Sequence, residues 1–159
     1  MAMNSLALST NNISAQLAGK LDVAGGKVLQ VVRATDSTDR STTSATFVDA
    51  SLSITITPQR NTSAILLIAS YNADTTNAGI GIVVQITDSS NNAISGTGNG
   101  FLFAGTRVIA FQTLFAYATP ATTSATTYKL RFRRGASSDT VTLVNSGNIA
   151  QLYAIEVSA

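Results

Sequence analysis

Residues 52–70 read LSITITPQRNTSAILLIAS, and this stretch decides the fold. Over residues 52–57, leucine and isoleucine alternate with serine and threonine, which is the period-two pattern of a β-strand with one buried face. Pro58 ends this strand because proline cannot donate to a strand ladder. The polar residues 61–63 then favour a turn, and the apolar run at 65–68 predicts a second strand.

Similar runs, rich in β-branched residues and separated by polar turns, continue in both directions from this pair. The sequence predicts strands at 27–34, 42–49, 52–57, 63–72, 80–87, 126–134, 140–145 and 149–157, with 101–118 forming two strands or one bent strand. Strands at this spacing are typical of sandwiches and jelly rolls. We therefore expect an all-β fold, an antiparallel jelly-roll-like β-sandwich over residues 26–159, preceded by a short N-terminal helical arm.

Residues 1–25 form the predicted arm. Ile13, Leu17 and Leu21 recur at a spacing of four and would share one face of a short helix that Gly25 and Gly26 end. Because so short a helix is marginal in water, it needs a surface to pack against. Two interpretations stay open: a loosely docked arm, and an arm that attaches or trimerises the protein.

The amino-acid composition restricts the classes of protein to which this chain can belong. Charged residues make up only 11% of the 159 residues, against roughly 25% in ordinary soluble domains. The surface must therefore be covered by uncharged polar groups, which lose water at less cost than ions and favour extensive contact between subunits. The net charge of +2 is spread along the chain, which argues against direct nucleic-acid binding. The N-terminus lacks the pattern of a secretory signal, and the longest apolar run is too short to span a bilayer, so we expect a soluble protein that does not enter membranes.

The residue inventory offers little for catalysis. The chain has no histidine and no cysteine, which excludes the usual triads, thiol chemistry and most metal sites. Most acidic residues fall in expected turns, where aspartate bonds the local backbone. Asp88 with Asn91 or Asn92 could hold calcium, but their spacing matches no calcium loop. We expect no enzymatic activity, no cofactor and no metal.

One strand concentrates positive charge. Lys129, Arg131 and Arg133 alternate with apolar residues, and Arg134 follows. The basic face either is solvated or paired with a neighbouring subunit, or it contacts an anionic partner such as a capsid surface or an acidic glycan. Most of the aromatic residues lie on strand faces that also carry aliphatic residues, so core packing is favoured over a sugar-stacking platform; the aromatic residues considered are Phe101, Phe103, Phe111, Phe115, Tyr117, Tyr128, Phe132 and Tyr153.

The segment GGKVLQVV, followed by TTSATFVD, LSITITP and SAILLIAS, resembles small domains of bacteriophage virion proteins, including the C-terminal regions of tail fibres. The preceding NNISAQLAGKLDVAGG is similar to the helical lead-in of such fibres. The likeness covers roughly residues 12–70; at Ala64 the pattern has a lysine, so any role of that lysine does not carry over. The resemblance implies a trimeric β-sandwich displayed on a phage particle and no catalytic residues.

These observations favour a non-enzymatic virion protein that is assembled in the host cytoplasm and exposed on the particle surface. Its partners would be further copies in a homotrimer and the major capsid protein or other virion proteins. A fibre needs a shaft and an attachment domain, and only residues 1–25 precede the sandwich, so we place a capsid decoration or cement knob first. The alternatives are a tail-fibre tip or receptor-binding protein, and a carbohydrate-binding module that contacts a host glycan.

Overall fold

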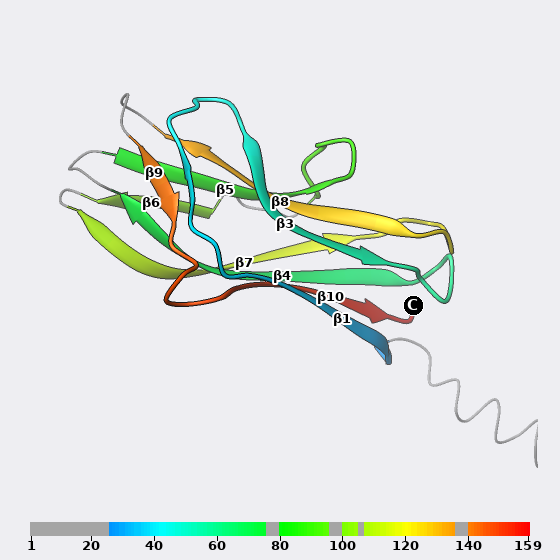
Figure 1. The fold of residues 1–159 in the computed structure, drawn as a ribbon. Coiled ribbons are helices and arrows are strands. Elements are labelled where there is room, and N and C mark those ends of the chain that lie inside the picture. The colour runs from blue at the N-terminus through cyan, green and yellow to red at the C-terminus, as the bar shows by residue number, and fades with distance from the viewer. Residues whose placement is uncertain (1–25, 76–79, 96–99, 105–106, 136–139) are drawn as a thin grey trace, which may run out of the picture.

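The computed structural model describes residues 26–75, 80–95, 100–104, 107–135 and 140–159, which form two packed antiparallel β-sheets (Figure 1). The strands in these residues are β1 (Val28–Asp36), β2 (Arg40–Thr42), β3 (Val48–Ile56), β4 (Ala64–Thr75), β5 (Ile80–Asp88), β6 (Gly100–Ala104), β7 (Val108–Ala118), β8 (Thr126–Arg134), β9 (Val141–Leu143) and β10 (Ala150–Val157). The all-β prediction is confirmed. The predicted helical arm lies in residues 1–25, outside the described residues.

The first sheet is built around β4. One edge of β4 pairs with β7 along its length, and the other edge pairs with β10 and then with β9. β1 pairs with β10, and β2 pairs with β9. We call this sheet A; sheet B has the order β3-β8-β5-β6. When the three-residue strands β2 and β9 are set aside, neighbouring strands follow the order β1-β10-β4-β7 in sheet A and β3-β8-β5-β6 in sheet B. This is the strand order of a jelly roll.

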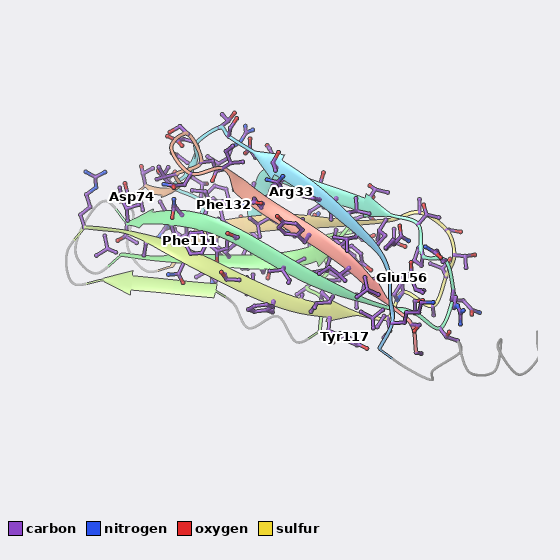
Figure 2. The ribbon with its side chains drawn as sticks, turned by 90° about the horizontal axis from the view of Figure 1, so that it is seen from below. Arg33, Asp74, Phe111, Tyr117, Phe132 and Glu156 are labelled. Carbon is purple, nitrogen blue, oxygen red and sulfur yellow. The ribbon has the colours of Figure 1, made fainter. Side chains whose placement is uncertain are left out.

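The core lies between the two sheets and follows the alternation in the sequence. Leu52, Ile54 and Ile56 of β3 are buried, as their spacing predicts, while the serines and threonines between them are exposed. Phe132 of β8 faces the same core (Figure 2), and Leu130 of that strand belongs to the same buried cluster. Each such side chain contributes roughly 1.5 to 3 kcal/mol when it is fully buried. Within the described residues this single cluster holds the sandwich together.

The predicted strand at 42–49 is wrong: β2 ends at Thr42, and β3 begins at Val48. In the loop between them the hydroxyl of Ser44 donates to the carbonyl of Thr46 at 2.7 Å and accepts from the Thr46 N–H at 3.0 Å. Such local bonds offer the backbone an alternative to a strand ladder. The segment 101–118 forms two strands, β6 and β7, the first of the two predicted arrangements.

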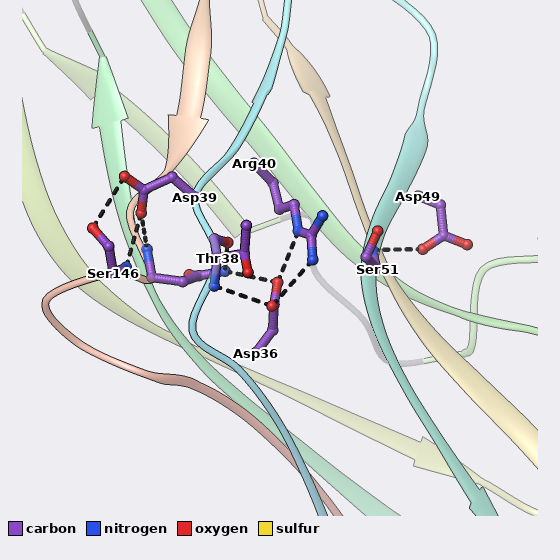
Figure 3. A network of polar contacts seen from close by, with 8 residues as sticks. Asp36, Thr38, Asp39, Arg40, Asp49, Ser51 and Ser146 are labelled. Atoms are coloured by element: carbon purple, nitrogen blue, oxygen red, sulfur yellow. Dashed lines mark hydrogen bonds and ion pairs between the residues drawn. The ribbon is translucent and has the colours of Figure 1, made fainter.

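Aspartates pin two neighbouring loops at one end of the sandwich (Figure 3). The guanidinium of Arg40 contacts Asp36 at 2.9 Å and holds the pKa of that carboxyl below its usual value. Asp39 accepts from the backbone N–H groups of Ser146 at 2.8 Å and Asn145 at 2.7 Å, and these bonds lower its pKa too. These aspartates therefore hold the β1–β2 loop against the β9–β10 loop, which is the turn-forming role expected of them.

Glu156 lies at the other end of β10 and is fully buried, on the face of that strand that carries Leu152 and Ala154 (Figure 2). Its carboxylate accepts from the Gln30 side chain at 2.5 Å and from the backbone N–H groups of Gln59 at 2.8 Å and Arg60 at 3.3 Å. Burial alone would raise its pKa, but these hydrogen bonds hold the pKa below its ordinary value. The carboxylate thus joins β1, β10 and the β3–β4 loop.

We predict that Glu156→Gln lowers the free energy of unfolding at neutral pH by about 2 kcal/mol, because the amide loses charge-assisted bonds and places a donor against backbone donors. Since the folded pKa is depressed, this stabilisation is present above the unfolded pKa near 4.5 and is lost as the pH falls through the folded pKa. Urea denaturation from pH 7 to pH 3 measures the effect. The difference between wild type and variant should shrink towards acid, and a difference that is constant with pH would contradict this role.

Candidate functional site

The outer faces of the two sheets differ sharply in chemistry. The outer face of sheet B carries the predicted basic strand, β8, with Lys129, Arg131 and Arg133 on the side opposite the core. Exposed serines and threonines of β3 lie beside them. The alternation of basic and apolar residues on β8 is therefore confirmed, and β3 and β8 together present a hydrophilic outer face.

Most of these basic groups are engaged within the chain. Arg131 Nη2 donates to the carbonyl of Phe47 at 2.6 Å, and Arg134 Nε donates to the carbonyl of Thr43 at 2.7 Å. The guanidinium of Arg133 stacks 5.1 Å above the Phe47 ring. The arginines thus fasten the β2–β3 loop to the sheet. A contact with an anionic partner remains a prediction.

Two adjacent rows on the outer face of sheet A are largely apolar. The strand registers place Val31, Ile155, Leu66 and Tyr117 side by side across β1, β10, β4 and β7. The next row along the strands contains Arg33, Tyr153, Ile68 and Phe115. Beyond a row of polar residues, Phe111 (Figure 2) and Ile109 continue this face along β7. We call the nine apolar residues of these rows the apolar face.

The prediction that core packing accounts for the aromatic residues is wrong for β7. Phe111 is 65% exposed, Phe115 56% and Tyr117 55%, whereas Tyr128 and Phe132 are buried as predicted. The opposite side of β7 carries small residues and Leu114, and that side faces the core. The signal was present in the sequence, because both sides of β7 are apolar and only one side can face the core. The side chains of Phe101 and Phe103 lie outside the described set.

A single cation lies within the rows of the apolar face. The Arg33 guanidinium lies 5.9 Å from the centre of the Tyr153 ring, and its Nε donates to Gln151 at 3.0 Å. The Tyr153 hydroxyl donates to the same Gln151 oxygen at 2.7 Å. These contacts tie the Arg33 guanidinium to two side chains of β10.

A groove of about 460 Å³ lies where the ends of β5 and β7 meet the start of β8. Its lining includes Asp88, Tyr117, Thr119 and Thr126, together with Tyr128. The Tyr128 hydroxyl is buried and has no hydrogen-bond partner within the described chain. Burial and the nearby Asp88 carboxylate raise the pKa of Tyr128 to about 12, so this hydroxyl is a neutral donor.

The calcium arrangement considered from the sequence does not assemble in the structure. The Asp88 carboxylate accepts from the backbone N–H groups of Ser90 at 2.8 Å and Asn92 at 2.9 Å, and from the Asn92 side chain at 3.0 Å. Asn91 instead accepts from Lys129 at 2.6 Å. No cluster of potential metal-ligating residues occurs in the described ranges. Within those same ranges no helix is long and apolar enough to cross a membrane.

Comparisons with known proteins add a limited likeness. No family model and no curated protein matches the sequence. Among solved structures, the VP2 subviral particle of infectious bursal disease virus is similar with a TM-score of 0.48 and 16% identity, covering 82% of this chain and 38% of that chain. The Gt strain of the same virus gives a TM-score of 0.45 and 16% identity over 86% of this chain and 39% of that chain. This chain thus spans well under half of the length of those chains.

We predict that Arg131→Met lowers the free energy of unfolding by about 1.5 kcal/mol, because it removes a charged donor to the Phe47 carbonyl. Lys129→Met is the matched control, since its contact with Asn91 is exposed, and the expected cost is below about 0.5 kcal/mol. Urea denaturation of both variants measures the two costs. Equal, negligible costs would show that the arginines do not anchor the loop.

Proposed function

We propose that this protein is a non-enzymatic virion structural protein, a homotrimeric capsid decoration or cement knob exposed on a phage particle. The observation that carries the proposal is the apolar face of sheet A, in a chain with only 11% charged residues. A free surface of this kind is costly in water, and large exposed apolar patches mark interaction sites. Further copies and the major capsid protein are the proposed partners.

The jelly-roll strand order supports the same proposal. This architecture is used by viral capsid domains, lectins and cupins. It agrees with the resemblance of residues 12–70 to phage virion domains. The described residues offer no cluster of metal-ligating groups, and the aspartates at the loop ends are engaged in turns and loop contacts. Assembly onto a shell therefore suits the described chain better than turnover of a substrate.

The proposed mechanism is mass action. A knob that binds the assembled shell but not its separate subunits stabilises the shell by the free energy of that binding. The predicted arm, with Ile13, Leu17 and Leu21, is the proposed attachment or trimerisation element, and the basic strand is the proposed contact for an anionic shell surface. The same knob would also serve as a tail-fibre tip, which is the alternative location.

Carbohydrate binding is a second candidate, and the groove beside Asp88 favours it. Sugar hydroxyls would pair with the threonines of the groove, while the Tyr117 ring lies at its lining. Thr119 is exposed there, so Thr119→Val removes its hydroxyl without disturbing the core. Glycan-array binding that Thr119→Val abolishes would support a glycan receptor site, and an array without any binding would remove this candidate.

The copy number of the chain per purified virion tests the proposed location. Quantitative mass spectrometry against the major shell protein should find the two chains at comparable abundance. A small fraction of the shell abundance would place the protein on the tail instead. Absence from purified particles would contradict a virion role altogether.

We predict that replacing the arm stripe, in Ile13→Ser/Leu17→Ser/Leu21→Ser, weakens trimerisation or shell binding while the sandwich stays folded. The reason is that a short helix is stable only when its apolar stripe is packed. Gln16→Ser/Lys20→Ser changes polar residues of the same segment and serves as the matched control. Light scattering and co-sedimentation with shells measure both effects; wild-type behaviour of the triple variant would show that the stripe is dispensable.

A further inference from the structure

We infer that the apolar face of sheet A is the surface through which copies of this chain pack together, with β7 of one copy against β1, β10 and β4 of the next. This inference deepens the proposed trimeric assembly, rests on it, and names the surface that forms the contact. The side chains in the rows of the apolar face all lie on regular strands within the described residues.

The apolar area fits a subunit interface that forms at high concentration. Three aromatic side chains at 55% to 65% exposure present roughly 250 to 450 Å², taking 150 to 250 Å² for each complete side chain. The aliphatic residues and Tyr153 raise the apolar total to roughly 450 to 650 Å². In a contact between the β7 side of one copy and the opposite side of the next, this total is the apolar area that the two copies bury together. A standard interface buries about 1,600 Å² in all, of which about 60% is apolar, so the face supplies roughly half of that apolar area, which suits a contact that dissociates on dilution.

Within the described residues, β7 is the strand at the edge of this face, and it lacks the features that normally keep an open strand edge from pairing with another chain. β7 is eleven residues long and reads VIAFQTLFAYA, with no charged residue and no proline. Within the described chain it pairs only with β4, so its second edge is open. Natural edge strands of this length are normally protected by charges, prolines or a covering element. A covering element supplied by the assembly would meet this requirement.

The layout of the face favours a second copy of the chain as the occupant. Three of its four aromatic residues lie on β7 at one side, and most of its aliphatic residues lie on β1, β10 and β4 at the other. Contact between the β7 side of one copy and the opposite side of the next is heterologous, and such contacts form a ring when the rotation between copies closes, as a trimer requires. Arg33 is the one charge in the two rows of the face, which is too little to select a strongly basic or acidic partner.

The position of the N-terminus agrees with this occupant. Gly26, to which residues 1–25 are joined, donates to the carbonyl of Ser158 at 3.0 Å, beside the start of β1. Val31 of the apolar face lies only a few residues further along the same strand. Copies that pack through sheet A therefore bring the starts of their arms close together. The Ile13, Leu17 and Leu21 stripe then has identical stripes nearby as packing partners.

The absence of cysteine makes a direct test possible. Thr113→Cys places one thiol in the middle of the apolar side of β7. Ser53→Cys places one thiol on the outer face of sheet B and serves as the matched control. Both positions are exposed in the isolated chain. In the full-length protein at high concentration, Thr113→Cys should react with a thiol reagent roughly tenfold more slowly than Ser53→Cys, as expected when about one copy in ten is free. Dilution should abolish the difference.

Equal reactivity at every concentration would overturn the inference. A second result would also overturn the inference: the Thr113→Cys thiol stays protected on dilution although the chain sediments as a monomer. In that case the chain's own arm would cover the apolar face. A second variant guards against misfolding: Phe115→Lys should dissociate the assembly, whereas Thr55→Lys on sheet B should not, with both circular dichroism spectra unchanged. An assembly that survives Phe115→Lys contradicts the inference.

The two claims can fail separately. If the chain is found in virions but its Thr113→Cys thiol stays freely reactive, the proposed function stands and this interface is wrong. A chain that is absent from virions but protects Thr113→Cys on self-association retains the interface and loses the proposed function.

Discussion

The first half of β4, residues 64–69, is apolar on both of its sides, and the rest of the structure depends on how those two sides are covered. The inner side, with Ile65, Leu67 and Ala69, packs into the core against sheet B. The outer side carries Leu66 and Ile68, which are only partly covered by the neighbouring strands. A two-layer sandwich can bury one side of each sheet, so these two residues stay outside the core, where we propose that another copy covers them.

The jelly-roll order distributes the remaining chemistry around this constraint. It places β4 between β7 on one side and β10 and β1 on the other, all of which carry apolar outer residues, and so collects these residues on one surface. It places the basic strand β8 in the opposite sheet, beside the hydroxyl-bearing β3. The result is a domain with one apolar face and one hydrophilic face. Such a domain suits a knob that packs with its copies on one side and meets solvent or a shell on the other.

Much of the fold could be predicted from local pattern. The alternation in residues 52–57 predicted β3 with its buried face, and the alternation of basic and apolar residues predicted β8 with its boundaries at 126 and 134. The strand at 42–49 could not be excluded from pattern alone, because the competing bonds made by Ser44 and Thr46 depend on local geometry. The pairing order of the strands depends on contacts between distant residues, which local pattern does not contain.

The candidate site was less predictable, because alternation defines two sides of a strand without saying which one is inside. In β7 the larger aromatic residues were assigned to the core, yet the side with Ala110, Ala116 and Ala118 faces inward. Small residues fit there because the core is already filled by large side chains of the other strands, such as Tyr128 and Phe132. The two apolar sides of β7 indicated a surface for a partner; only the strand register shows that this surface continues across the sheet.

The most direct measurement is the mass of the full-length chain in solution, by sedimentation equilibrium over a wide concentration range. We expect a trimer, with three times the chain mass of 16.4 kDa, that dissociates on dilution. A single species of 16.4 kDa at every concentration would contradict the central claim, because the apolar face of sheet A would then remain open to water.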